Sequence, residues 1–331
     1  MSGVFARVAK RVTVTAPARL HLGFLDLNGG TGRAFGSIGL AISGFKTRVS
    51  VAPAEHMRVS GPESDGVRAY VDAMRRILEL GYAYDVKVDE LAPRHAGLGS
   101  GTQLALAVAA AMRRLHEMPL DVRGDAVRLG RGARSGAGIG LFLTGGLVVD
   151  GGRASAGAPA PVISNIPFPD HWRILVVLDP HRQGAHGTDE AAAFARLPPA
   201  SDADAEYLCR LLVMQLLPAV AEADLSEFGS ALEAIQNRLG DYFAPAQGGP
   251  FVSASVAATL DRLKRAGAVG IGQSSWGPTG YAFVASAEAA NRTLEAARGH
   301  PDSRGVDIHV CRALNSGADI MAYASADAPE P

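Results

Sequence analysis

The stretch Pro93–Glu117, PRHAGLGSGTQLALAVAAAMRRLHE, runs from a glycine-rich loop straight into an apolar, alanine-rich segment. Its alternating glycines allow backbone N–H groups to turn toward one point, and the hydroxyls of Ser100 and Thr102 add further donors. We predict a helix over residues 102–117, whose positive end favours an anion, most often phosphate, at the loop. The same glycines also suit a tight turn with no ligand. The predicted phosphate ligands are Gly97, Leu98, Gly99, Ser100, Gly101, Thr102 and Gln103.

The spacing of this loop differs from the two best-known phosphate-binding loops. It lacks the Lys of G-x-x-x-x-G-K-[ST], and its glycines do not follow G-x-G-x-x-G. Neither the P-loop mechanism nor the dinucleotide-binding mechanism is therefore predicted, and the anion has to be inferred from the rest of the chain.

The composition indicates a substantial core and a balanced charge. Of the 331 residues, 47% are hydrophobic and 20% are charged, and the formal net charge is −1. This balance gives no electrostatic reason to expect nucleic acid or a membrane surface as a partner. The N-terminus lacks the apolar core of a signal peptide, and the longest apolar runs, such as residues 104–112, are too short to span a bilayer. We therefore expect a cytoplasmic protein, with Cys209 and Cys311 as buried thiols rather than metal ligands.

Hydrophobic periodicity predicts helices and strands mixed along the first half of the chain. Alternation predicts the strands, and a period of 3.6 residues predicts a helix that ends at a C-cap at Gly81. The expected strands are 11–24, 45–54, 57–61 and 84–91, and the expected helices besides that of the loop are 66–81 and 121–129.

A stretch rich in Gly, Ala, Ser and Pro, residues 150–172, is typical of a connector between domains. We therefore predict two domains, 1–160 and 161–331, and an α+β fold in which the second domain is a small sandwich. The last residues, 324–331, are expected to fray. The expected strands of the second half are 172–180, 268–275, 280–286 and 306–313, and the expected helices lie near 188–197, 203–223, 225–240, 253–266 and 287–299.

Residues 93–100 match P-x-x-x-G-L-G-S, the signature of the galactokinase, homoserine kinase, mevalonate kinase and phosphomevalonate kinase (GHMP) superfamily. The stretches TAPARLHLGFLDLNG, 15–29, and GIGQSSWGPTGYAF, 270–283, resemble the N-terminal and C-terminal motifs of that superfamily. The resemblance implies a GHMP-kinase-like fold of two domains, the first like domain 2 of ribosomal protein S5 and the second ferredoxin-like. It also implies a nucleotide or phosphate site between the two domains.

One motif departs from the kinases of this superfamily. These kinases usually carry Ser-Gly-x-Asp, whose carboxylate assists a hydroxyl nucleophile, whereas here Ser135, Gly136 and Ala137 are followed by Gly138. The loop also reads Gly-Ser-Gly-Thr-Gln where the kinases usually read Gly-Ser-Ser-Ala-Ala. Homoserine kinases manage without the Asp, so an ATP-dependent small-molecule kinase stays as the alternative.

These departures have a pattern of their own. The segments APARLHLGFLDLNG, FGSIGLAI, GLGSGTQLALA, GRGARSGAGIGLF, GGLVVDGG and QSSWGPTGYAF together resemble the β-ribofuranosylaminobenzene 5′-phosphate synthases, a branch of the same superfamily. The resemblance implies condensation of 4-aminobenzoate or 4-hydroxybenzoate with phosphoribosyl pyrophosphate in tetrahydromethanopterin biosynthesis. It also implies Mg²⁺ as cofactor, with neither pyridoxal phosphate nor ATP. A single polar contact would be enough to choose between the two arenes.

The implied chemistry suits a site without the kinase carboxylate. The nucleophile is a ring carbon made electron-rich by the para amino or hydroxyl group, and carbon dioxide leaves from it in place of a proton. No strong base is therefore needed at that carbon. The tasks that remain are to stabilise the departing pyrophosphate and an oxocarbenium-like sugar, and to align the ring.

Three residues of the N-terminal motif are the catalytic candidates. Arg19 would pair with the arene carboxylate or a phosphate, or else form a structural salt bridge. His21 would orient the substrate or titrate near neutrality, or else be a satisfied strand histidine. Asp26 would hold Mg²⁺ together with Ser100 or stabilise positive charge on the sugar, or else cap a turn.

The middle and C-terminal motifs supply the other candidates. Arg134, Ser135 and Gly136 are predicted phosphate ligands beside Arg131, although arginines at a helix end are also commonly solvated. Trp276 would stack on the arene, or else belong to the core. Arg182 and His186 follow a strand, where sites often lie, or else belong to a surface loop ahead of a helix, and their surroundings do not form a zinc motif. The predicted substrate-binding residues are Arg182, His186, Gln273, Ser274, Ser275, Trp276 and Gly277.

Other functions stay open at this point. The chain lacks the acidic pair before a Thr-rich loop that common phosphoribosyltransferases carry, so the phosphoribosyl donor follows from the resemblance alone. A non-catalytic regulator that keeps the fold and a phosphate ligand is a third interpretation, which tolerance of alanine at Arg19, Asp26 and loop 97–103 would favour. We expect a homodimer, an ordinary state for an enzyme.

Overall fold

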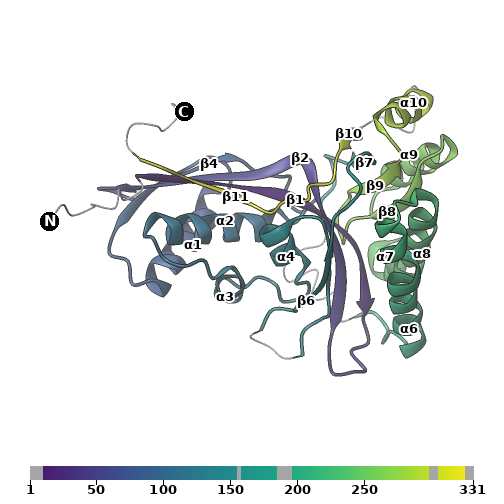
Figure 1. The fold of residues 1–331 in the computed structure, drawn as a ribbon, viewed down its shortest axis with the longest axis horizontal. Helices are drawn as coiled ribbons and strands as arrows, with labels where there is room; N and C mark the ends of the chain where they lie inside the picture. Colours follow the sequence, from purple (N-terminus) through teal and green to yellow (C-terminus); the bar gives the residue numbers. More distant parts are fainter. Residues whose placement is uncertain (1–9, 155–157, 185–195, 298–304, 325–331) are drawn as a thin grey trace.

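The structure is a computed structural model that describes residues 10–154, 158–184, 196–297 and 305–324 (Figure 1). At its centre lie two long antiparallel strands, β1 (Arg11–Asp26) and β2 (Phe35–Ala54). They belong to a seven-stranded sheet in the order β11-β1-β2-β4-β3, in which β5 also pairs with β2 and β6 pairs with β5. The other strands of this sheet are β3 (Arg58–Ser60), β4 (Ala83–Glu90), β5 (Leu147–Asp150), β6 (Val162–Ile166) and β11 (Asp319–Tyr323).

Helices cover one face of this sheet, which Figure 1 shows above them. The alanine-rich helix α2 contacts both β1 and β2 and is buried along almost its whole length. Because alanine side chains are short, the helix can lie close to the strands while larger residues fill the space around it. Val51, Val71 and Met112 belong to the resulting core, whose apolar burial stabilises the layer. The helices of this domain are α1 (Ser64–Ile77), α2 (Ser100–Leu115), α3 (Val122–Arg128) and α4 (Ala137–Thr144).

The second sheet has four antiparallel strands in the order β10-β7-β9-β8. In chain order these strands are β7 (Arg173–Leu178), β8 (Val269–Gln273), β9 (Gly280–Val284) and β10 (Asp307–Cys311). The chain therefore runs β-α-β-β-α-β with a sheet order of fourth, first, third, second, and the predicted ferredoxin-like domain is confirmed. Its helices are α6 (Asp202–Leu211), α7 (Leu217–Ala221), α8 (Leu225–Gln247), α9 (Ala254–Arg265) and α10 (Ala287–Ala297).

The helix expected over 203–223 is interrupted. A π-helical segment, Leu212–Leu216, separates α6 from α7, and Pro218 stands in the first turn of α7. Because proline has no N–H and its ring crowds the carbonyl four residues earlier, a regular α-helical turn cannot pass through this point.

Other elements differ from the sequence-based expectation in length or were not expected. Strand β2 begins ten residues before the expected strand at 45, while α4, β5, β6 and β11 were not predicted as separate elements. Helix α1 ends at Ile77 with Leu78 as its C-cap, instead of the expected C-cap at Gly81, because the chain already turns at Glu79, whose φ is 54°. Cys311 is buried as expected, whereas Cys209 is exposed, so that part of the prediction is wrong. Most of the helix expected near 188–197, His186 and the tail from 325 onward lie outside the described residues.

The predicted domain boundary at 160 does not separate the two sheets. Strands β6 and β11 both follow it in sequence, yet both pair within the first sheet, β6 with β5 and β11 with β1. These pairings satisfy backbone groups that would otherwise lie at open strand edges. The first domain is therefore completed by chain from the second half.

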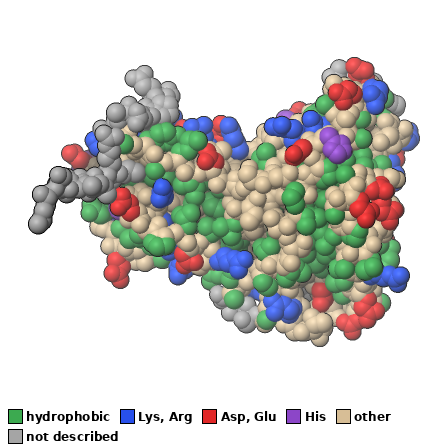
Figure 2. Space-filling view, in the orientation of Figure 1, with side chains coloured by type: hydrophobic (Ala, Val, Ile, Leu, Met, Phe, Trp, Pro, Cys, Tyr) green, Lys and Arg blue, Asp and Glu red, His purple; other side chains and the backbone are tan. Residues whose placement is uncertain are grey.

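The surface carries charges of both signs. On the face shown in Figure 2, Lys and Arg side chains are intermixed with Asp and Glu. None of the helices in the described ranges is both long and apolar enough to cross a membrane.

Candidate active site

Three motifs that are far apart in the sequence meet at the glycine-rich loop. The hydroxyl of Ser274 donates to the carbonyl of Gly97 at 2.7 Å and accepts from the N–H of His21 at 2.9 Å. The N–H of Arg19 donates to the carbonyl of Leu98 at 3.0 Å. Ser274 is fully buried. These bonds join β1 and the loop, which belong to the first domain, to the end of β8 in the second. The loop therefore lies where the two domains meet, as the resemblance implied.

Arg19 lies across the loop. Gly99 has a φ of 73°, and a Cβ added there would stand 2.8 Å from Nε of Arg19. Only glycine combines this left-handed backbone with so close a side chain. Gly99 is also the N-cap of α2, and its carbonyl accepts from the N–H groups of Thr102 and Gln103. A guanidinium and the positive end of a helix thus converge on one place, where an anion is favourable.

Arg131 approaches the same helix end from the middle motif. Its guanidinium lies 3.5 Å from where a Cβ of Gly101 would stand, and it donates to the hydroxyl of Tyr70, whose ring it also faces. Burial lowers the pKa of Arg131. Among the described residues, no carboxylate forms an ion pair with it, which leaves its charge available to an anion at α2.

Two polar side chains of the loop are already engaged within the protein. The hydroxyl of Ser100 donates to the carbonyl of Pro93 at 3.3 Å, and the buried amide of Gln103 donates to the carbonyl of Gly138 at 2.9 Å. The second bond fastens α2 to α4. Gln103 therefore has a structural contact where the sequence predicted a phosphate ligand.

The middle motif binds a carboxylate of the protein itself. Asp150 is fully buried and accepts hydrogen bonds from the N–H groups of Gly136 and Ala137, at 2.9 and 3.1 Å. It also accepts from Ser37 and from the N–H of Gly152. Burial raises the pKa of the Asp150 carboxyl, although these donors pull it down. The positive end of α4 is thus filled by Asp150.

This arrangement changes the interpretation of the predicted phosphate ligands in the middle motif. The hydroxyl of Ser135 lies 2.6 Å from that of Ser37, and the N–H of Gly136 is bonded to Asp150. Neither group is directed to the glycine loop, because a neighbouring carboxylate already uses the helix end. Arg134 precedes this turn and is half-buried.

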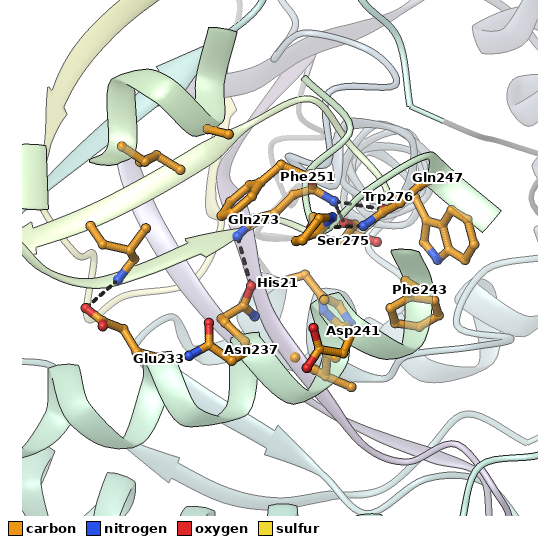
Figure 3. A pocket seen from close by; sticks show the side chains of 18 of the residues that line it. His21, Glu233, Asn237, Asp241, Phe243, Gln247, Phe251, Gln273, Ser275 and Trp276 are labelled. Carbon is orange, nitrogen blue, oxygen red and sulfur yellow. Dashed lines mark hydrogen bonds between the residues drawn. The ribbon is translucent and has the colours of Figure 1, made fainter. Parts of the chain in front are cut away.

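A cavity of about 490 Å³ opens beside the loop segment 274–277, between β1 and the helices of the second domain. In Figure 3, Phe243 and Trp276 lie on one side of it and Glu233 on the other. Gln273 also lines it, but its side chain bonds Val252, Gln247 and the carbonyl of Ser275. The residues that line the cavity are His21, Gly23, Phe24, Glu233, Gln236, Asn237, Leu239, Gly240, Asp241, Phe243, Gln247, Pro250, Phe251, Ala257, Leu260, Asp261, Lys264, Ile271, Gln273, Ser275 and Trp276.

Most of the predicted substrate-binding residues gather at this place. Ser275 and Trp276 line the cavity, and Gly277 packs against the loop, since a Cβ there would stand 2.2 Å from the carbonyl oxygen of Ala96. Arg182 lies farther out and donates to the carbonyl of Val252 at 3.1 Å. His186 lies outside the described residues.

His21 is a neutral residue of the cavity wall. It is 3% exposed, and burial, reinforced by the positive charge of Arg19, lowers its pKa well below the usual range. The expectation that it titrates near neutrality is therefore wrong, because the charged imidazole would lose its hydration beside another cation.

The buried state of His21 predicts a loss of stability in acid. Below about pH 6.5 the histidine of the unfolded chain takes up a proton that the folded chain refuses, so lowering the pH from 7.5 to 5.5 should cost about 1.4 kcal/mol through this residue. Urea denaturation of the wild type and of His21→Gln at both pH values measures how much of the loss of stability comes from His21. An equal pH dependence in both proteins would contradict it.

Asp26 lies away from the loop. It follows Arg19 by seven residues on an extended strand, which places the two about 20 Å apart. Its carboxylate accepts from the N–H groups of Asn28 and Gly29, at 2.9 and 2.7 Å, and so caps a turn. Asp26 and Ser100 therefore do not form the predicted Mg²⁺ pair. No group of three His, Cys, Asp or Glu side chains suited to a metal occurs within the described ranges.

The comparisons with known proteins agree with this geometry. Residues 67–146 match the GHMP kinases N terminal domain, and residues 216–302 match the GHMP kinases C terminal family. Over 321 residues the chain is 35% identical to the β-ribofuranosylphenol 5′-phosphate synthase of Archaeoglobus fulgidus, covering 92% of this chain and 97% of that protein. The chain belongs to the β-ribofuranosylphenol 5′-phosphate synthase family. A second relative, the synthase of Methanothermobacter thermautotrophicus, is 31% identical over 293 residues, which cover 82% of this chain and 88% of that protein. Because its relatives are synthases, this protein is an enzyme.

Solved structures show that this synthase family shares its fold with kinases and decarboxylases. Homoserine kinase from Cytophaga hutchinsonii superposes with a TM-score of 0.70 at 18% identity, covering 97% of this chain and 100% of that one. Mevalonate diphosphate decarboxylase from Staphylococcus aureus gives 0.65 at 16% identity, covering 94% and 98%. At such low identity the likeness concerns the fold alone.

The sequence reasoning missed the part of the candidate site that α8 supplies. Glu233, Asn237 and Asp241 recur every four residues and all line the cavity. Residues at this spacing share one face of a helix. The recurrence of polar residues at this spacing was the available signal, but nothing in the sequence indicated that they line a cavity beside β1.

Proposed function

We propose that this enzyme joins a 4-hydroxylated benzoate to phosphoribosyl pyrophosphate, with loss of carbon dioxide and pyrophosphate. The observation that carries the proposal is the cavity with aromatic walls beside the glycine loop, since Ser275 and Trp276 line it and the same segment bonds Gly97. The relatives are named for a ribofuranosylphenol product, which favours 4-hydroxybenzoate over 4-aminobenzoate.

The proposed reaction balances without a base at the reacting carbon. The ring carbon that bears the carboxylate attacks C1′ of the ribose, and the bond from C1′ to the pyrophosphate oxygen breaks. The bond from the ring to the carboxylate then breaks, carbon dioxide leaves, and its electron pair restores the aromatic ring. The phenolic oxygen supplies electron density from the para position throughout.

The chain's own groups supply binding and charge for these steps. Arg19, Arg131 and the positive end of α2 would hold the phosphate groups and stabilise the departing pyrophosphate. The aromatic walls of the cavity, including Phe243 and Trp276, would orient the ring.

Mg²⁺ remains part of the proposal as an ion carried by the pyrophosphate. Mg²⁺ commonly binds through substrate phosphates and few protein ligands. The donors around the loop are N–H groups and guanidinium groups, which suit an anion and not a bare cation, and Asp26 is distant. When bound, the ion would neutralise pyrophosphate charge.

Release of labelled carbon dioxide tests the proposal. Purified protein would be mixed with Mg²⁺, phosphoribosyl pyrophosphate and carboxyl-labelled 4-hydroxybenzoate, with labelled 4-aminobenzoate and a tube without enzyme in parallel. We expect enzyme-dependent release that requires the pyrophosphate donor. No release from either arene, together with ADP formation from ATP and candidate alcohols, would support the kinase instead.

A substitution at Gly138, where the kinases of the superfamily carry an aspartate, gives a further prediction. A Cβ at Gly138 would stand 3.4 Å from Cγ2 of Thr102, an ordinary contact distance, and the carboxylate of Gly138→Asp would lie beside the first turn of α2. We expect the KM for phosphoribosyl pyrophosphate to rise at least about tenfold, or about 1.4 kcal/mol, by repulsion of its phosphates. The isosteric, neutral Gly138→Asn should change it by less than about threefold. Similar KM values in both variants would contradict an anion at this helix end.

A further inference from the structure

The cavity contains a buried polar atom with no partner in the described chain. His21 is 3% exposed, its Nε2 has no hydrogen-bond partner, and its ring lines the cavity. Its backbone N–H is held by Ser274, so the position of the ring on β1 is fixed. A buried polar atom is unfavourable unless water or a ligand completes its hydrogen bonding. Nε2 of His21 therefore marks a place for a polar atom of a ligand.

Aromatic rings continue from His21 along the wall of the cavity. Ring centroids lie 4.4 Å apart for His21 and Phe24, 6.3 Å for Phe24 and Phe243, and 5.0 Å for Phe243 and Trp276. Each of these rings is less than a tenth exposed. Walls of this kind suit a flat aromatic ligand, because rings pack favourably edge to face or offset. An arene with one hydrogen-bonding substituent satisfies both the walls and the imidazole.

The charges around the cavity decide which end of the arene lies at His21. Lys264 lines the cavity but is paired with Glu233 at 2.5 Å, and Glu233 lies across the cavity from Trp276 (Figure 3). Arg19 is not among the lining residues, and its side chain lies across Gly99. A carboxylate among the aromatic walls would lose hydration without gaining a cation, whereas a hydroxyl loses much less. The carboxylate end belongs toward Arg19 and the loop.

We propose that Nε2 of His21 accepts a hydrogen bond from the para hydroxyl of the arene, and that this contact selects a hydroxyl over an amino group. This inference rests on the proposed function. A phenolic O–H is a stronger donor than the N–H of an aromatic amine, and a neutral imidazole accepts one such bond. The bond strengthens as positive charge spreads to the para oxygen during attack, so the contact also favours the chemical step.

Binding of three arenes to the full-length protein tests the proposal. Calorimetry with Mg²⁺ and inorganic pyrophosphate present would compare 4-hydroxybenzoate, 4-aminobenzoate and benzoate. The wild type should bind 4-hydroxybenzoate about tenfold more tightly than benzoate, with 4-aminobenzoate in between. In His21→Leu this preference should fall below about twofold, while the affinity for benzoate stays within about twofold of the wild type.

Two more variants make the test decisive. His21→Gln keeps a hydrogen-bonding side chain and should retain part of the preference for 4-hydroxybenzoate over benzoate. This variant replaces His21→Leu in the test if the leucine variant fails to fold. His56→Leu makes the same change at an exposed histidine outside the cavity lining and should leave the tenfold preference unchanged. An undiminished preference in folded His21→Leu, or in folded His21→Gln where the leucine variant does not fold, overturns the inference. If the wild type neither binds 4-hydroxybenzoate nor releases carbon dioxide, the proposed function itself has failed.

Discussion

Replacing Gly97 with alanine is expected to lower the stability by about 2–5 kcal/mol and to remove most of the activity. The φ of Gly97 is +83°, and a Cβ there would stand 2.1 Å from the carbonyl oxygen of Ser274. That atom belongs to the backbone of the second domain, so it cannot move aside as a flexible side chain would. The loop would have to separate from Ser274, and the hydrogen bond that joins them at 2.7 Å would be lost.

A second glycine, Gly248, serves as a control that distinguishes the close contact with Ser274 from the strain of a left-handed backbone. Gly248 has nearly the same φ, +82°, but nothing lies within 4 Å of the Cβ position. Gly248→Ala should therefore cost only about 1–2 kcal/mol, the penalty of the left-handed backbone. Urea denaturation and carbon dioxide release would be measured for both variants. Equal losses of stability and activity would show that closeness to Ser274 is not what requires glycine at 97.

The sequence predicted the fold well where local pattern and tertiary contact agree. The glycine loop, α2 and the alternating strand β1 could be identified because their residues follow one period over more than ten positions. The ferredoxin-like order of the second domain followed from the resemblance of the motifs. Strands β6 and β11 were missed because each has only five residues, of which two in β6 and three in β11 are exposed, and because β11 pairs with a strand far away in the sequence.

The sequence predicted which motifs meet at the candidate site, but only some of the side-chain contacts there. Motifs at 15–29, 93–100 and 270–283 do meet, since Ser274 bonds both the loop and His21. Sequence could not show that Asp26 bends back to cap its own turn or that Asp150 occupies the helix end beside Gly136. Both contacts depend on which donors the folded chain brings next to each carboxylate, and the pattern of neighbouring residues in the sequence does not show this.

Replacing Asp150 with alanine is expected to cost about 3–5 kcal/mol, because each buried donor left without an acceptor costs about 1–3 kcal/mol. Its carboxylate accepts three backbone N–H groups, at 2.9, 3.1 and 3.0 Å, and the hydroxyl of Ser37. Asp121 provides the matched control, since it caps α3 through the N–H of Gly124 at 3.0 Å and its side chain is 44% exposed. Asp121→Ala should lower stability by only about 1 kcal/mol. Similar losses in the two variants would contradict the buried role of Asp150.

Adding phosphate tests whether the N-terminal end of α4 is occupied by the Asp150 carboxylate. In Asp150→Ala the N–H groups of Gly136 and Ala137 lose their acceptor, and an anion can replace the carboxylate. Phosphate at about ten times its Kd for this position should restore about 1.4 kcal/mol to the variant beyond any gain in the wild type. The glycine loop contributes equally to both proteins, so the difference reports on α4 alone. An equal gain in both would show that phosphate does not take the place of the Asp150 carboxylate at α4.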